Sequence, residues 1–150
     1  ALRVNRVSAP LEPLAAYADG SAFKLYSLDV GLLGALDGLN VRVLLEGDAL
    51  FREFKGSIAE QFVCQQLTMM NGHSPYCWSA ENSSGELDFL FERNGKAVPV
   101  EVKKGTHRQA KLLVIMQKRH GYPLAYRFSA DRSRDVGPIR DVPLYMAGIV

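Results

Sequence analysis

The feature that most constrains the fold is a stretch of strand-forming residues around one Asn-Gly pair, at residues 85–103. Asn94 and Gly95 both tolerate the positive φ of a type I′ turn, so this stretch predicts a β-hairpin with a two-residue loop. The loop fixes the register of the two arms, because Arg93 then pairs with Lys96 and every later pair follows from that one.

This register is expected to give the hairpin one charged face and one apolar face. Asp88 should lie opposite Glu101, and Glu86 opposite Lys103. The apolar face should pack against a helix, and it collects Leu87, Phe89, Phe91, Val98, Val100 and Val102. Like charges directly opposite each other destabilise a strand pair. Asp88 and Glu101 therefore either splay into water or hold a divalent cation, Mg²⁺ or Mn²⁺, for which carboxylate oxygens are suitable ligands.

A third carboxylate lies on a helix expected at about residues 51–70, where apolar residues recur at helical spacing. Glu60 borders the apolar stripe of this helix, close to Val63 and Leu67. An unpaired carboxylate is costly to bury. Glu60 is therefore expected either to reach water at the edge of the stripe or to join the acidic pair of the hairpin.

The remaining elements fit one α/β domain, since 150 residues can bury a substantial core. A short helix is expected after a cap at Asp29. Further strands are expected at residues 2–7, 23–28, 75–79 and 123–129, and a helix at 108–119. The strand, helix and strand that begin with the second hairpin arm should form a parallel crossover. Cys64 and Cys77 are expected to be free, buried thiols.

Charge is distributed unevenly along the chain. Residues 1–102 carry 8 Lys+Arg against 13 Asp+Glu, whereas residues 103–150 carry 10 against 3. Lys104, His107, Arg108 and Lys111 could form a surface that contacts nucleic acid phosphates, or simply a solvated helix face. No apolar run has the length of a membrane span and the sequence starts without a signal-peptide block, so a cytoplasmic protein without membrane contact is expected.

The order of a helix bearing Glu60, a strand bearing Asp88 and a strand reading Glu101-Val102-Lys103 resembles the PD-(D/E)XK, or restriction-endonuclease-like, superfamily. The amino-acid sequence is also similar to the uncharacterised C-terminal domain of many prokaryotic AAA+ ATP-binding proteins. The similarity lies in the segments Gly56-Ser-Ile-Ala-Glu, Gly85-Glu-Leu-Asp and Val98-Pro-Val-Glu-Val-Lys. The superfamily signature has proline before its aspartate, whereas Leu87 stands here.

The resemblance implies a mixed sheet flanked by helices at residues 51–150, preceded by a remnant of a winged-helix-like connector at residues 1–50. It implies that Asp88, Glu101 and the Val102 carbonyl bind Mg²⁺ or Mn²⁺, with Lys103 beside the attacking water. Glu60 would support the metal or the lysine. ATP would bind to an N-terminal AAA+ module, because no GxxxxGK[ST] occurs in this sequence.

Two functions follow as expectations. The first is a metal-dependent nuclease, a hydrolase that cleaves phosphodiester bonds of nucleic acid, with DNA favoured over RNA. The alternative is a non-catalytic module that docks nucleic acid or a protein partner for the ATPase, because a nuclease-like fold does not by itself determine the reaction.

Overall fold

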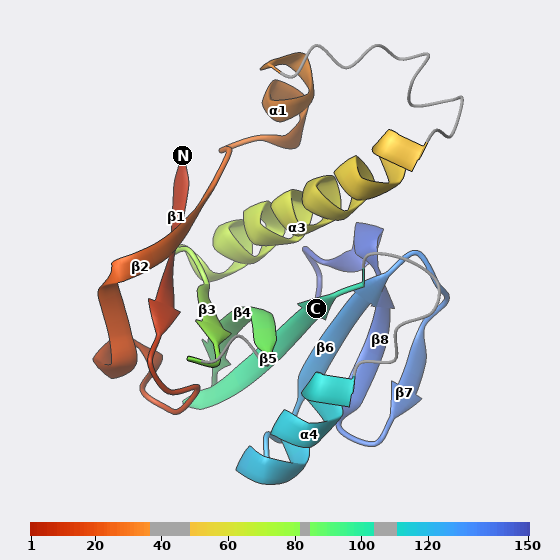
Figure 1. The fold of residues 1–150 in the computed structure, drawn as a ribbon. Helices are drawn as coiled ribbons and strands as arrows, with labels where there is room; N and C mark the ends of the chain where they lie inside the picture. The colour runs from red at the N-terminus through yellow and green to blue at the C-terminus, as the bar shows by residue number, and fades with distance from the viewer. Residues whose placement is uncertain (37–48, 82–84, 104–110) are drawn as a thin grey trace.

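The computed structural model describes residues 1–36, 49–81, 85–103 and 111–150, and Figure 1 shows their arrangement. Two α-helices lie against one sheet, and a third, short helix contacts the longest one. The strands are β1 (Leu2–Val7), β2 (Ala18–Tyr26), β3 (Tyr76–Ser79), β4 (Glu86–Arg93), β5 (Lys96–Val102), β6 (Ala125–Ser129), β7 (Arg134–Val136) and β8 (Ile139–Pro143). The helices are α1 (Val30–Leu36), α3 (Ala49–Asn71) and α4 (Lys111–His120), with short 3₁₀ turns η1 (Leu14–Tyr17) and η2 (Leu144–Met146).

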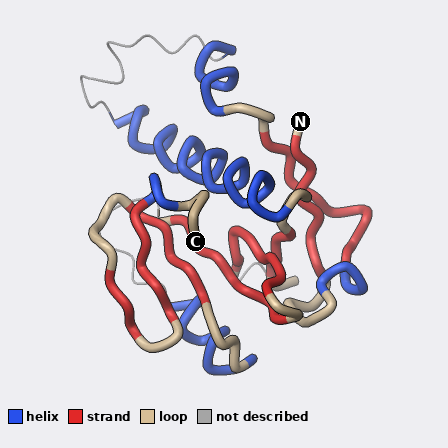
Figure 2. The backbone as a smooth tube through the Cα atoms, turned by 180° about the vertical axis from the view of Figure 1, so that it is seen from behind, coloured by secondary structure: helices blue, strands red, loops and turns tan. Residues whose placement is uncertain are grey.

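The protein is a mixed α/β domain, whose described residues form an eight-stranded sheet and three α-helices. The strand order is β2-β1-β3-β4-β5-β6-β8-β7, and Figure 2 shows the strands as one layer crossed by α3. β5, β6 and β8 run parallel, as does the contact between β1 and β3. The predicted parallel crossover from β5 through α4 to β6 is confirmed. β8 lies inside the sheet, between β6 and β7.

The Asn-Gly hairpin forms as predicted. Asn94 and Gly95 have φ values of 53° and 72°, the positive values that the turn requires. The pairs run from Arg93 with Lys96 to Phe89 with Val100, in the predicted register.

An extra residue in β4 interrupts the regular alternation of the first hairpin arm. On the neighbouring strand β3, Tyr76 pairs with Leu90 and Trp78 with Leu87, so three steps along β4 match two along β3. Such a bulge changes the face to which the following side chains point. Leu87 therefore joins Leu90 on the second face of the sheet, and the prediction that it shares a face with Phe89 is wrong.

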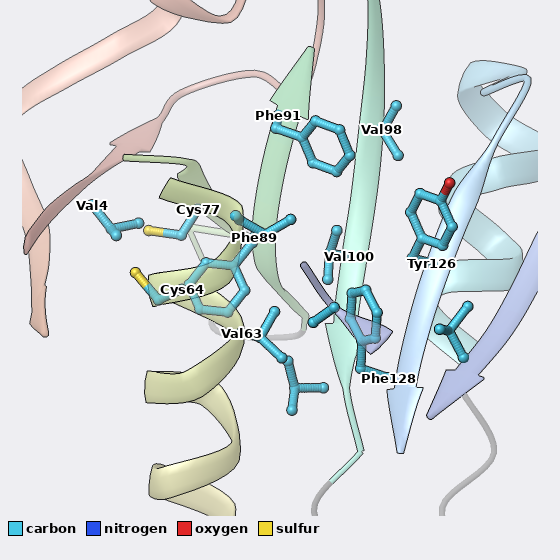
Figure 3. Packing of buried hydrophobic residues seen from close by; sticks show 14 residues of the cluster. Val4, Val63, Cys64, Cys77, Phe89, Phe91, Val98, Val100, Tyr126 and Phe128 are labelled. Atoms are coloured by element: carbon cyan, nitrogen blue, oxygen red, sulfur yellow. The ribbon is translucent and has the colours of Figure 1, made fainter. Parts of the chain in front are cut away.

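The first face of the sheet packs against α3. Val63, Cys64 and Leu67 of this helix are fully buried against a cluster that includes Phe89 and Val100. Figure 3 shows Val63 and Cys64 pointing toward Phe89 and Val100. Both cysteines are free and buried, as predicted. Burial raises the pKa of the Cys64 thiol to about 12, which makes it an unreactive core residue.

The second face of the sheet is also apolar over much of its area, which corrects the prediction of one charged face. Leu113 and Met116 of α4 are buried against Leu90 and Ala97. The cause is the crossover itself, because a helix that joins two parallel strands returns over one face of the sheet. With α3 on the first face, α4 covers the second. Glu86, Asp88, Glu101 and Lys103 lie at the end of the hairpin away from its turn, whereas Glu92, Arg93 and Lys96 lie beside the turn.

The first strands of the chain belong to the same sheet as the rest. Val4, Val7 and Leu14 are fully buried, and the Leu14 N–H donates to Glu92 Oε1 at 2.5 Å. The predicted cap of α1 forms, since Leu32 N donates to Asp29 Oδ1 at 2.9 Å. A functional boundary near residue 50 stays a prediction, while the sheet itself takes strands from both sides of it.

Candidate functional site

Asp88 lies where β4 and β5 stop pairing. The ladder of these strands ends at Phe89 with Val100. Beyond that pair, the Val102 N–H donates to Asp88 Oδ2 at 2.7 Å. A side-chain oxygen thus takes the place of a backbone acceptor, and the Asp88 carboxylate lies against the peptide that joins Glu101 to Val102. This geometry replaces the predicted directly opposed pair of Asp88 and Glu101.

Glu101 begins a row of charges that crosses three parallel strands. It pairs in register with Arg127 of β6, which pairs with Asp141 of β8. Arg127 donates to both carboxylate oxygens of Asp141, at 2.5 and 2.7 Å. Glu101 Oε2 is buried and has no hydrogen-bond donor among the described residues. Burial raises the pKa of the Glu101 carboxyl, and the positive charges of Arg127 and Lys103 only partly oppose this.

Lys103 follows Glu101 by two residues and ends in an ion pair with Asp131. Its Nζ lies 3.0 Å from Asp131 Oδ2, an oxygen on the segment after β6. The predicted cross-strand pair of Lys103 with Glu86 is wrong, because the β4 and β5 ladder ends before these residues and Glu86 instead pairs with Lys24 of β2.

Glu60 of α3 is buried, with 8 % of its surface exposed, and its carboxylate accepts a hydrogen bond from a residue of β2. The Tyr26 hydroxyl donates to Glu60 Oε2 at 3.3 Å. Burial and the nearby carboxylates raise the pKa of Tyr26, so its hydroxyl keeps its proton. The prediction that Glu60 borders the buried face is confirmed, and a tyrosine from a distant strand partly satisfies its carboxylate.

Lys24 and Tyr26 bring β2 into the neighbourhood of these carboxylates. Burial alone would lower the pKa of the Lys24 ammonium, but the hydrogen bond to Glu86 and the charges of Glu86, Glu60 and Asp88 raise it above its ordinary value. The charges of Glu60 and Asp88 also act on Tyr26. Lys24 thus lies within electrostatic reach of three carboxylates.

The residues expected to form one metal site fall into two neighbouring groups. The charges of Asp88 and Glu60 act on Lys24 and Tyr26, whereas the charges of Arg127 and Lys103 act on Glu101. Within residues 1–36, 49–81, 85–103 and 111–150, no three or more His, Cys, Asp or Glu side chains are grouped so as to hold a metal ion. The contact that the fold makes between the two hairpin arms here joins the Asp88 carboxylate to the Val102 N–H.

The proposed nucleic-acid contacts are described only in part. Lys111 is exposed at the start of α4. Lys104, His107 and Arg108 lie outside the described residues. None of the helices in the described part of the chain is long and apolar enough to cross a bilayer.

Sequence reasoning missed Lys24, Tyr26 and Arg127 as neighbours of the site. The spacing of Lys24 and Tyr26 along a strand does place both on one face, opposite the exposed Phe23 and Leu25. Nothing in the sequence, however, indicates that this face meets Glu60. Arg127 becomes recognisable only once β6 is placed beside β5, because the contact depends on the pairing register.

These observations define the protein as a mixed α/β domain that carries acidic residues at the end of a central hairpin. The family described as "Domain of unknown function (DUF4143)" matches residues 55–142, which is more than half of the chain, and the protein belongs to this family. No curated protein and no solved structure was found to match it.

Proposed function

We propose that this chain is a nuclease-like domain of the PD-(D/E)XK type, which binds a divalent cation and hydrolyses phosphodiester bonds of nucleic acid. The observation that carries the proposal is the contact between the Asp88 carboxylate and the Glu101-Val102 peptide. In this contact the Val102 N–H donates to Asp88 Oδ2 at 2.7 Å, so the Asp88 carboxylate lies beside the residue that follows Glu101.

The chemistry of these groups fits a hard cation. Glu101 has a buried oxygen to which no described residue donates a hydrogen bond, and such an atom is suited to a positive ion. Mg²⁺ commonly uses only one or two carboxylates and keeps several waters. Asp88, Glu101 and the Val102 carbonyl would therefore suffice as protein ligands, with Glu60 supporting them from α3. A bound Mg²⁺ or Mn²⁺ would supply an activated water and offset negative charge on the phosphate.

The residues of the chain itself would bind and orient the substrate. Lys103 directly follows the strand that carries Glu101, and its ammonium forms an ion pair with Asp131. From there it would bind the attacking water or a phosphate oxygen. Lys104, His107, Arg108 and Lys111 follow along the chain and would contact the backbone of the nucleic acid, DNA in preference to RNA.

The same proposal extends to the parent protein. The restriction-endonuclease-like core would begin near residue 51, and residues 1–50 would include the remnant of a winged-helix-like connector. The domain would form the C-terminal part of a prokaryotic, cytoplasmic AAA+ ATP-binding protein, whose N-terminal module would be its partner and would bind the ATP.

A cleavage assay tests the proposed function. Single- and double-stranded DNA and RNA are incubated with the protein and Mg²⁺ or Mn²⁺. Lys103→Ala should abolish cleavage and leave cation binding largely intact, while Lys96→Ala, at the exposed turn of the hairpin, serves as the charge-matched control. Cleavage that survives Lys103→Ala, or a wild-type protein inert on all four substrates, would contradict the proposal.

The ion pair of Lys103 favours a second candidate, a docking module without catalysis. Asp131 already neutralises the lysine that the motif assigns to the reaction. In this case the protein would bind nucleic acid without cleaving it. Its affinity would fall steeply with salt, because phosphate contacts release counterions.

A further inference from the structure

Lys24 joins parts of the sheet that do not pair with each other. β1 and β3 lie between β2 and β4 in the strand order, yet the Lys24 ammonium forms an ion pair with Glu86 of β4. The contact is partly shielded from water, since 34 % of the Lys24 side chain is exposed. A long side chain held in this way loses rotamer freedom, so the charges around it must favour the arrangement.

Three carboxylates act on the charge of Lys24. Glu86 is its direct partner, and the charges of Glu60 and Asp88 also favour its charged form. Tyr26, two residues along the same strand, holds Glu60 by a hydrogen bond. β2 thus brings one ammonium group and one hydroxyl to the carboxylates that the motif associates with a cation.

We propose that Lys24 is the internal counter-cation of this site, which neutralises Asp88 and its acidic neighbours when no metal is bound and weakens the binding of a divalent cation there. The inference rests on the proposed function, since it assumes that the cation binds to Asp88.

The physical reason is competition for the same negative charge. An ammonium close to a carboxylate stabilises the carboxylate without metal and repels a cation that arrives beside it. The net affinity for the metal is the difference between these effects. Lys24 would therefore set the concentration of divalent cation at which the site fills, and it would do so from a segment that lies outside the family match at residues 55–142.

The test compares wild-type protein with Lys24→Gln, Lys24→Arg and Lys96→Gln, using the whole chain. Each protein is titrated with Mn²⁺ in a calorimeter, and its thermal unfolding is followed in EDTA and in Mn²⁺. Lys24→Gln should bind Mn²⁺ about threefold to tenfold more tightly, the range expected of a partly screened charge pair. It should also unfold at a lower temperature than Lys96→Gln in EDTA. Lys24→Arg keeps the charge and should retain the wild-type affinity.

The outcomes separate the inference from the function on which it rests. Unchanged or weaker Mn²⁺ binding by Lys24→Gln, with binding by the wild type intact, would overturn the role of Lys24 and leave the cation site standing. Binding by none of the proteins would overturn the cation site, and the inference with it. Should Lys24→Gln fail to fold, Lys24→Met, which keeps the aliphatic stem, takes its place with the same expected result.

Discussion

Asp88 has a structural task as well as a proposed chemical one. Its carboxylate accepts the Val102 N–H at the point where the β4 and β5 ladder has ended. Without this acceptor, a backbone donor beside the buried Val102 side chain would lose its partner. A residue of this kind couples the stability of the hairpin to the integrity of the candidate site.

Replacing Asp88 should therefore destabilise the protein even when no metal is present. Asp88→Ala leaves the Val102 N–H without its acceptor and should lower the free energy of unfolding by about 1–3 kcal/mol. Asp88→Asn retains an acceptor oxygen and should lose less. Urea unfolding in EDTA measures both, and an Asp88→Ala variant as stable as the wild type would contradict this account.

Glu101 should make stability depend on pH. Its pKa is raised in the folded chain above the ordinary 4.5, so the folded state binds the proton more tightly than the unfolded state. The stability that it contributes is fully present below the ordinary value and is lost as the pH rises through the raised value. Glu101→Gln removes this loss.

In EDTA, Glu101→Gln should become progressively more stable relative to the wild type as the pH rises from acid to neutral. Urea unfolding at several pH values provides the comparison. A constant difference between the two proteins across this range would show that the ionisation of Glu101 has no such effect.

At the level of secondary structure, the predictable features are those that local chemistry determines. Asn94 and Gly95 specify a turn by their backbone preferences, and the turn specifies the pairing from Arg93 to Phe89. The bulge in β4 depends on how β4 meets β3, a strand separated from it by a loop. The contact between Lys24 and Glu86 depends on the arrangement of four strands. Neither could be inferred from local sequence.

The packing of α4 on the second face can be tested by a matched pair of variants. Leu113 is fully buried, whereas Ile115, two residues away on the same helix, has 57 % of its surface exposed. Leu113→Ala should lower the free energy of unfolding by about 2–5 kcal/mol. Ile115→Ala should change it by no more than about 0.5 kcal/mol. Similar small losses for both would mean that α4 does not cover this face.

In the molecule as a whole, the first thirty residues contribute two strands and buried side chains to the same sheet and core as the rest of the chain. Tyr122, after α4, donates its hydroxyl to the Pro10 carbonyl at 2.7 Å. The Ala97 N–H donates to Glu12 Oε1 at 2.9 Å. Contacts so far apart in sequence give the N-terminal strands a share in both core clusters. The fold class was predictable from the order of elements, but the contacts of the N-terminal residues with distant parts of the chain were not.

Removal of residues 1–29 should therefore abolish cooperative folding. The shortened chain would lack β1 and β2 and the buried side chains of Val4, Val7 and Leu14. Circular dichroism during urea unfolding should show a broad transition, unlike the wild type. As a milder comparison, Leu14→Ala should be strongly destabilising while Leu25→Ala, at an exposed position, should not. A sharp transition at the wild-type midpoint in the shortened chain would refute the expectation.

The proposed binding of a divalent cation by Asp88 and Glu101 can be tested by NMR. Substoichiometric Mn²⁺ is added to ¹⁵N-labelled protein, because this paramagnetic ion broadens the amide signals nearest to it. We expect the amides of residues 87–89 and 101–103 to broaden first, and Asp88→Ala to remove the effect. Broadening centred elsewhere, or the same broadening in Asp88→Ala, would contradict the proposed binding.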